Sequence, residues 1–195
     1  NNQGKAILSP KTTMHDPGIA ETSVQSIKPN QLHARDLDAS AEINKLRKAD
    51  PLEAQQALSN ISDHMPHMKP AEQVKILSYL ADSLGYPNID LATQQKIVKL
   101  IEVNFPKQST DDFQTKFYVG QVVQNLAKVL SNGRLQGQVD APVSEFLMRN
   151  RYGFGMEIEE QNNIEFNLRY ARDNANLSPS AKEILKRLPM NPNNS

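Results

Sequence analysis

Apolar residues recur at helical spacing along most of the chain. The run Val74, Leu77, Leu80 and Leu84 is a clear example, because steps of three and four residues keep every side chain on one face of a helix. No run alternates apolar and polar residues over four or more positions in a β-branched context, which is the pattern of a half-buried strand. The sequence therefore predicts an all-α fold.

Capping signals divide this pattern into separate helices. Asp50, Pro51 and Glu53 supply an N-cap acceptor, a proline at the first helical position and an acidic residue in the first turn. Related signals predict further helix starts at Lys69-Pro70, Asp90, Ser109 to Asp112, Asp140-Ala141-Pro142, Glu157 and Ser178-Pro179. Helix ends are expected near Pro66, Gly85, Pro106 and Gly133, with Gly85 free to adopt a positive φ.

The two ends of the chain differ from its middle. Residues 1–30 contain three prolines and two glycines without any sustained period, which predicts an extended or loop-like segment. We expect a single helical domain over residues 31–188 and a tail over 189–195, where prolines stand among asparagines. Because the chain begins with Asn1 rather than Met, we expect that its natural start and any targeting signal lie outside this sequence.

Two stretches within residues 51–131 match each other. At an offset of 39 residues, Gln55-Gln56 pairs with Gln94-Gln95, Leu58 with Ile97 and Ile61 with Leu100. Met65-Pro66 recurs 40 residues later as Phe105-Pro106, and Leu77, Leu80 and Leu84 recur 46 residues later as Val123, Leu126 and Leu130. The offset grows because the helix that holds Val123, Leu126 and Leu130 is longer than the helix that it matches. The pattern predicts a tandem helical hairpin, with antiparallel hairpins stacked as a short α-solenoid-like or bundle domain.

This spacing near 40, with a proline-broken loop between two amphipathic helices, resembles the HEAT and armadillo class of helical repeats. The resemblance covers about residues 51–131 and implies that the helices before 50 and after 140 cap the stack, since one hairpin cannot bury its apolar face alone. It also implies a grooved surface that holds a partner protein. Leucine-rich helices between proline-started turns are similar in style to large bacterial effector proteins that are injected into host cells.

Charge and composition exclude several classes of function. The chain has 22 basic and 22 acidic residues, so we expect no extended nucleic-acid groove, which needs a surplus of Lys and Arg. It has no cysteine, which excludes disulfides, thiolate metal sites and cysteine nucleophiles. No apolar run approaches the ~20 residues that a transmembrane helix needs. We therefore expect a soluble protein, and no cofactor is expected.

Asp63, His64, His67 and Glu72 form the only cluster with residue types that bind metal ions. A zinc site needs three or four converging ligands, and Pro66 breaks the helix between the two histidines. We therefore expect two surface histidines at a helix end, and no metal site.

An unusual local string offers the best candidate site. Arg149, Arg151, Tyr152 and Phe154 stand beside two glycines, an arrangement that can bind a phosphate or a carboxylate, since arginine donates two parallel hydrogen bonds and glycine lets backbone amides approach. The string lacks the glycine spacing and lysine of a P-loop. The alternative is an interhelical loop whose Tyr152 and Phe154 pack onto the last helices.

Three functions remain open from the sequence. The first is a protein-interaction or scaffold domain without catalytic activity, which the repeat, the neutral charge and the scarcity of catalytic residues favour. The second is a secreted effector domain that modifies host proteins without a cysteine, for example by recruiting ubiquitin transfer. The third is a helical assembly segment of a larger polypeptide. Neither the oligomeric state nor the compartment follows from the residues.

Overall fold

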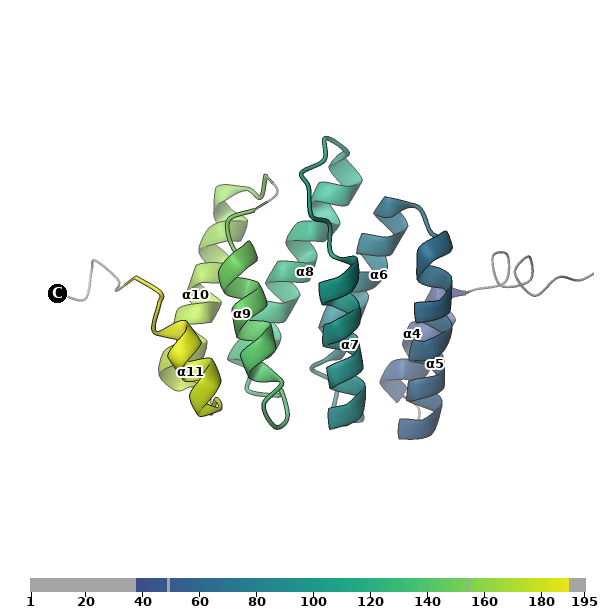
Figure 1. The fold of residues 1–195 in the computed structure, drawn as a ribbon, viewed down its shortest axis with the longest axis horizontal. Coiled ribbons are helices and arrows are strands. Elements are labelled where there is room, and N and C mark those ends of the chain that lie inside the picture. The colour runs from purple at the N-terminus through teal and green to yellow at the C-terminus, as the bar shows by residue number, and fades with distance from the viewer. Residues whose placement is uncertain (1–37, 49, 154, 190–195) are drawn as a thin grey trace, which may run out of the picture. The chain divides into compact units, whose positions relative to one another are not determined.

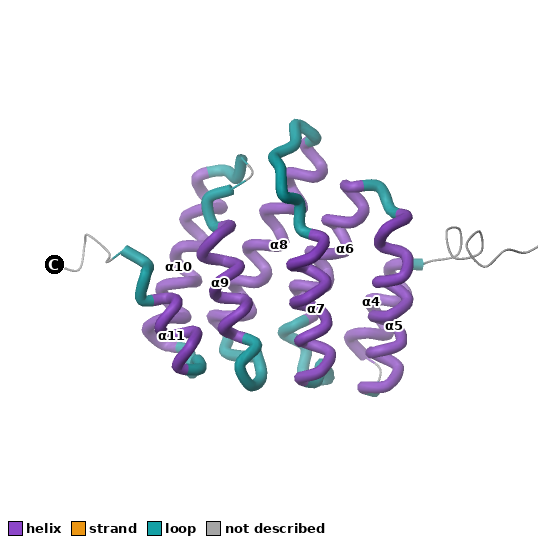
Figure 2. Tube along the Cα trace, viewed as in Figure 1, coloured by secondary structure: helices purple, strands orange, loops and turns teal. Residues whose placement is uncertain are grey.

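Every regular element of the described chain is a helix. The computed structural model describes residues 38–48, 50–153 and 155–189. The helices are α4 (Ala39–Lys48), α5 (Pro51–His64), α6 (Pro70–Ser83), α7 (Leu91–Asn104), α8 (Phe113–Ser131), α9 (Asp140–Asn150), α10 (Ile158–Asn174) and α11 (Pro179–Leu185), with a 3₁₀ turn, η1 (Met65–His67), after α5. No strand occurs in these ranges (Figure 2), which confirms the all-α prediction.

The helices form two layers within the unit Asp38–Ser195 (Figure 1). One layer contains α4, α6, α8 and α10, and the other contains α5, α7, α9 and α11. Consecutive helices alternate between the layers, so each pair joined by a short loop is antiparallel. The helix α8 packs closely against both α6 and α10, whereas α7 packs much less closely against α5 and α9. The second layer is therefore more open than the first.

The core lies between the two layers. The large side chains that are almost completely buried come from helices of both layers and include Leu46, Ile61, Leu77, Leu80, Ile97, Leu126, Leu130 and Leu147. Burial of each such side chain stabilises the fold by roughly 1.5–3 kcal/mol. None of the helices in the described ranges is long and apolar enough to span a membrane.

Several predicted caps are present. Asp50 accepts hydrogen bonds from the amides of Leu52 and Glu53, each at 3.0 Å, and Pro51 is the first residue of α5. Asp90 caps α7 through the amide of Thr93, and Ser178 caps α11 through the amide of Ala181. Glu157 and Glu160 form a capping box at the start of α10. In each case a short acceptor binds an amide that the helix leaves unpaired.

Two local predictions were wrong. The capping box expected from Ser109 to Asp112 does not form, because Asp112 is itself the N-cap of α8, which begins at Phe113, and accepts the Thr115 amide at 2.9 Å. Asp140, the predicted start of α9, is the first residue of that helix, and its carboxylate binds Ser178.

The second wrong prediction concerns the end of α6. Gly85 is not among the glycines with positive φ, which are Gly133, Gly137 and Gly155. The end of α6 closes instead through short turns, in which the amide of Gly85 bonds to Asp82 O and that of Tyr86 to Ser83 O.

Arg47 fixes α4 onto the end of α6. Its guanidinium donates to Ser83 Oγ, to Tyr79 O and to the Asp82 carboxylate, and it lies 4.8 Å from the centre of the Tyr86 ring. A cation at a helix C-terminus also interacts favourably with the helix dipole. The interactions hold the short helix α4 at one end of the layer.

The helices that match in the sequence occupy equivalent layers of the fold. The matched helices α5 and α7 lie in one layer and α6 and α8 in the other (Figure 1). Matched residues such as Leu80 and Leu126 are both buried. The resemblance to HEAT and armadillo repeats stays a prediction. The predicted loop-like segment 1–30, residues 31–37 and most of the predicted tail, 190–195, lie outside the described residues.

Candidate functional site

Arg151, one of the predicted binding residues, is engaged within the fold. Its Nε lies 3.4 Å from Glu165 Oε1 of α10, and its guanidinium lies 4.6 Å from the centre of the Tyr152 ring. Only 16% of each charged side chain is exposed. The Tyr152 hydroxyl donates to the same carboxylate, and Arg169 lies 3.4 Å from its other oxygen. Glu165 thus occupies the position at which an external carboxylate would meet Arg151.

Arg149 lies in different surroundings from Arg151. Its side chain is exposed and lines a depression of about 260 Å³ between the end of α7 and α9, together with Phe105, Lys107 and Phe146. The structure therefore does not bring the two arginines together on one ligand. Phe154, the remaining predicted residue, lies outside the described residues.

The expectation of two surface histidines was wrong for one of them, because His64 is 7% exposed. His64 Nδ1 lies 2.6 Å from Asn60 O within α5, and His67 is exposed at the end of η1. In the described ranges no group of three or more His, Asp or Glu side chains is placed to hold a metal ion. His15 and His33 lie outside these ranges.

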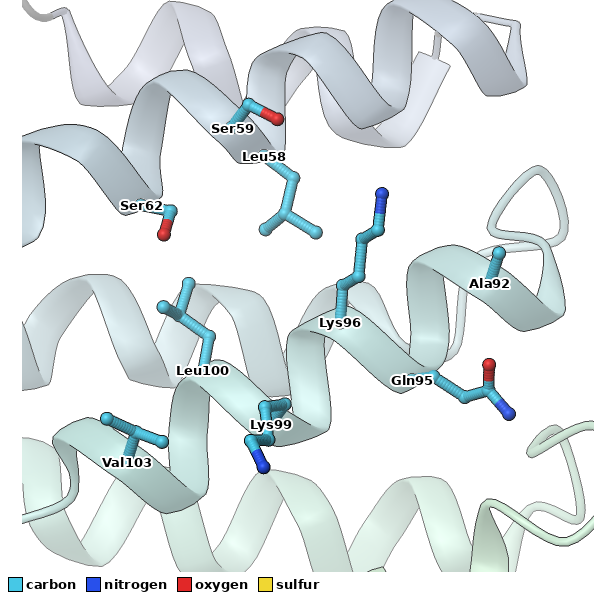
Figure 3. Close-up of a pocket in the computed structure, with 9 residues that line it drawn as sticks. All are labelled: Leu58, Ser59, Ser62, Ala92, Gln95, Lys96, Lys99, Leu100 and Val103. Carbon is cyan, nitrogen blue, oxygen red and sulfur yellow. The ribbon is translucent and has the colours of Figure 1, made fainter.

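A groove of about 490 Å³ runs between α5 and α7. Leu58 of α5 and Leu100 of α7 extend into it from opposite sides, and Val103 lies at its rim with 62% of its surface exposed (Figure 3). The remaining lining residues are Ser59, Ser62, Ala92, Gln95, Lys96 and Lys99. Ser59, Ser62 and Ala92 are small side chains, so they leave much of the space in the groove unfilled.

The charged residues of this groove are all basic. Lys96 extends toward α5, whereas Lys99 leaves α7 on the other side (Figure 3). Both side chains are exposed, and neither forms an ion pair with any described residue. No carboxylate lines the groove. An apolar floor beside unpaired ammonium groups can bind a ligand that carries both apolar and acidic groups.

A second groove of about 450 Å³ lies on the other side of α7, toward α9. It shares Gln95 and Lys99 with the first groove and adds Leu91, Val98 and Pro142 as apolar lining. Glu102 also lines it, so its charge is mixed. The two grooves together make α7 the central ridge of an uneven surface on the more open layer.

The groove residues were not predicted as a site from the sequence. Leu58 and Leu100 belong to the matched positions of the repeat, and in the structure Leu58 is buried and Leu100 half-buried. The available signal was the basic pair Lys96 and Lys99 beside apolar residues on one helix. The distance between α5 and α7, which opens the groove, depends on tertiary packing. Comparison of this chain with models of protein families, with curated protein sequences and with solved structures finds no match.

Proposed function

We propose that this chain is a protein-interaction domain that binds a segment of a partner protein along α7. The observation that carries the proposal is the open groove between α5 and α7, with an apolar floor at Leu58 and Leu100 and two lysines without ion partners among the described residues. Binding sites are typically concave and mostly apolar, with a few polar groups that fix the orientation of the ligand.

The openness of the second layer supports the same function. Single exposed apolar residues are ordinary on protein surfaces, but here Val103 and Leu91 lie on the same helix and each lines one of the two grooves beside it. A helix laid into such a groove covers apolar side chains of both walls at once. The surface defined by α5, α7 and α9 is therefore the one that we propose for the scaffold function.

Selection from a displayed peptide library tests this proposal. The full chain and its Val103→Asp variant would be screened in parallel, because Val103 is exposed enough to be replaced without loss of the fold. We expect peptides that bind the unmodified chain and bind the variant about tenfold more weakly or worse, as for a central contact of an interface. Phe166→Asp, a matched change at an exposed residue of α10, should leave binding unchanged.

The proposal would be overturned if the selection yields no peptide whose binding depends on Val103. Peptides that respond to Phe166→Asp alone would overturn it too, because they would place the binding surface on the other layer.

A further inference from the structure

The groove between α5 and α7 has two chemically different ends. Toward the C-terminus of α7 it is apolar, where Leu100 and Val103 face Leu58 (Figure 3). One helical turn earlier on α7 stands Lys96, which extends toward α5. Residues four apart on a helix are separated by about 6 Å along the axis. A ligand therefore meets an apolar contact and a positive charge about one helical turn apart.

The positive charge of Lys96 has no strong partner on the described surface. The pKa of Asp90, at the start of the same helix, is lowered mainly by hydrogen bonds from Thr93, whose amide donates at 2.8 Å, and only to a smaller extent by the charge of Lys96. Lys99 adds a second ammonium group on the outer side of α7. Charge complementarity therefore favours a ligand with a carboxylate near Lys96, and disfavours a basic one.

The walls of the groove favour a helical ligand over an extended one. Both walls are helices, whose backbone amides and carbonyls are bonded internally, so an extended peptide would bury its own backbone groups with few partners. A helix brings its backbone hydrogen bonds with it. The lining residues Ala92, Lys96, Leu100 and Val103 form one stripe along α7, and the small side chains Ser59 and Ser62 on α5 leave room for the backbone of another helix.

We infer that the groove binds an amphipathic helix of a partner protein, with an apolar residue seated between Leu58 and Leu100 and an Asp or Glu three or four positions away that pairs with Lys96. The inference rests on the proposed function and specifies the chemistry of the partner. The spacing follows from the helical rise, since side chains at i and i+4 or i and i+3 lie on the same face.

The peptides selected on the full chain provide the test. Those that depend on Val103 should share an apolar residue and an acidic residue three or four positions apart. For such a peptide, Lys96→Glu should weaken binding about tenfold at low ionic strength, and the loss should shrink as salt is added. Replacing the acidic residue of the peptide with Lys should restore binding to the Lys96→Glu variant. Lys128→Glu, the same charge change at an exposed residue of α8, should have no effect.

Different failures separate the two proposals. Peptides that depend on Val103 but show neither acidic residues nor sensitivity to Lys96→Glu would overturn this inference and leave the proposed function standing. A selection without any Val103-dependent peptide would overturn the proposed function itself. Sedimentation that shows a dimer of the full chain, lost on Val103→Asp, would also overturn the inference, because a second copy would then be the occupant.

Discussion

Asp140, in the first turn of α9, accepts two hydrogen bonds from Ser178, which caps α11. The Ser178 amide and hydroxyl each lie 2.6 Å from a carboxylate oxygen, and Asp140 is 3% exposed. Hydrogen bonds to a charged acceptor are among the stronger ones in proteins. The pair joins the last two helices of the more open layer, which also pack against each other.

Replacement of Asp140 should therefore destabilise the fold. We expect Asp140→Asn to lower the free energy of unfolding by about 1.5–3 kcal/mol, because the asparagine oxygen can accept only one of the two Ser178 hydrogen bonds, while its NH2 group faces the other Ser178 donor and the charge is lost. Urea denaturation followed by circular dichroism measures this change. Asp63→Asn, at an exposed position of α5, should change the free energy by less than about 0.5 kcal/mol. Equal losses in the two variants would contradict the assigned role of Asp140.

Gln94 connects three separate segments from a buried position on α7. Its amide nitrogen donates to Leu84 O and Arg134 O, and its oxygen accepts the Gln136 amide at 2.8 Å. Gln94→Leu should cost at least about 2 kcal/mol of unfolding free energy, because it leaves these backbone groups without their partner. The adjacent Gln95→Ala is the control and should alter stability by less than about 0.5 kcal/mol. Chemical denaturation of both variants decides whether Gln94 has this role.

The two arginines at the C-terminal end of α9 should behave differently. Arg151→Ala should lower the free energy of unfolding by about 1–2 kcal/mol, because Glu165 loses a largely buried partner. Arg149→Ala removes an exposed side chain and should leave thermal unfolding nearly unchanged. If instead Arg151→Ala melts like the unmodified chain, the ion pair with Glu165 does not contribute to the fold, and the original prediction of an anion site at Arg151 regains support.

Local features of this fold could be predicted from the sequence, whereas contacts between distant segments could not. Helix positions and caps such as Asp50 and Ser178 follow from local rules, because the acceptor and the amides it binds are neighbours in the chain. The helix start at Asp140 was also predicted, but only the tertiary fold reveals the hydrogen-bond partner of its carboxylate, 38 residues away. Gln94 and Gln55 matched in the overlay, yet Gln94 is buried among loop carbonyls and Gln55 is half-buried. The groove depends on the spacing of α5 and α7, which periodicity does not encode.

Thr115 should control the acidity of Asp112 at the start of α8. The pKa of Asp112 is held below its ordinary value, first by the Thr115 hydroxyl, which donates at 2.6 Å, and then by the Thr115 amide. Thr115→Val should raise this pKa toward the ordinary value of about 3.9. A titration of the Asp112 carboxyl followed by ¹³C NMR would show the shift. An unchanged midpoint would mean that the hydroxyl bond does not form in solution.

The same pair predicts a pH dependence of stability. A carboxyl whose pKa is lower in the folded state stabilises the fold fully above its unfolded pKa of about 3.9, and this contribution is lost as pH falls through the folded pKa. The advantage of the unmodified chain over Asp112→Asn should therefore be present at neutral pH and decrease below about pH 4. Urea midpoints measured from pH 2.5 to 7 test the sign. A difference that grows as pH falls would contradict it.

The most direct test of the central claim is methyl NMR of the full chain with a selected peptide. With leucine and valine methyl groups labelled, the signals of Leu58, Leu100 and Val103 should shift on titration, while those of Val74 and Leu130, buried on α6 and α8, should not. Such a pattern would place the ligand between α5 and α7. Binding without shifts at these three residues would contradict the account, because the peptide would then occupy a different surface.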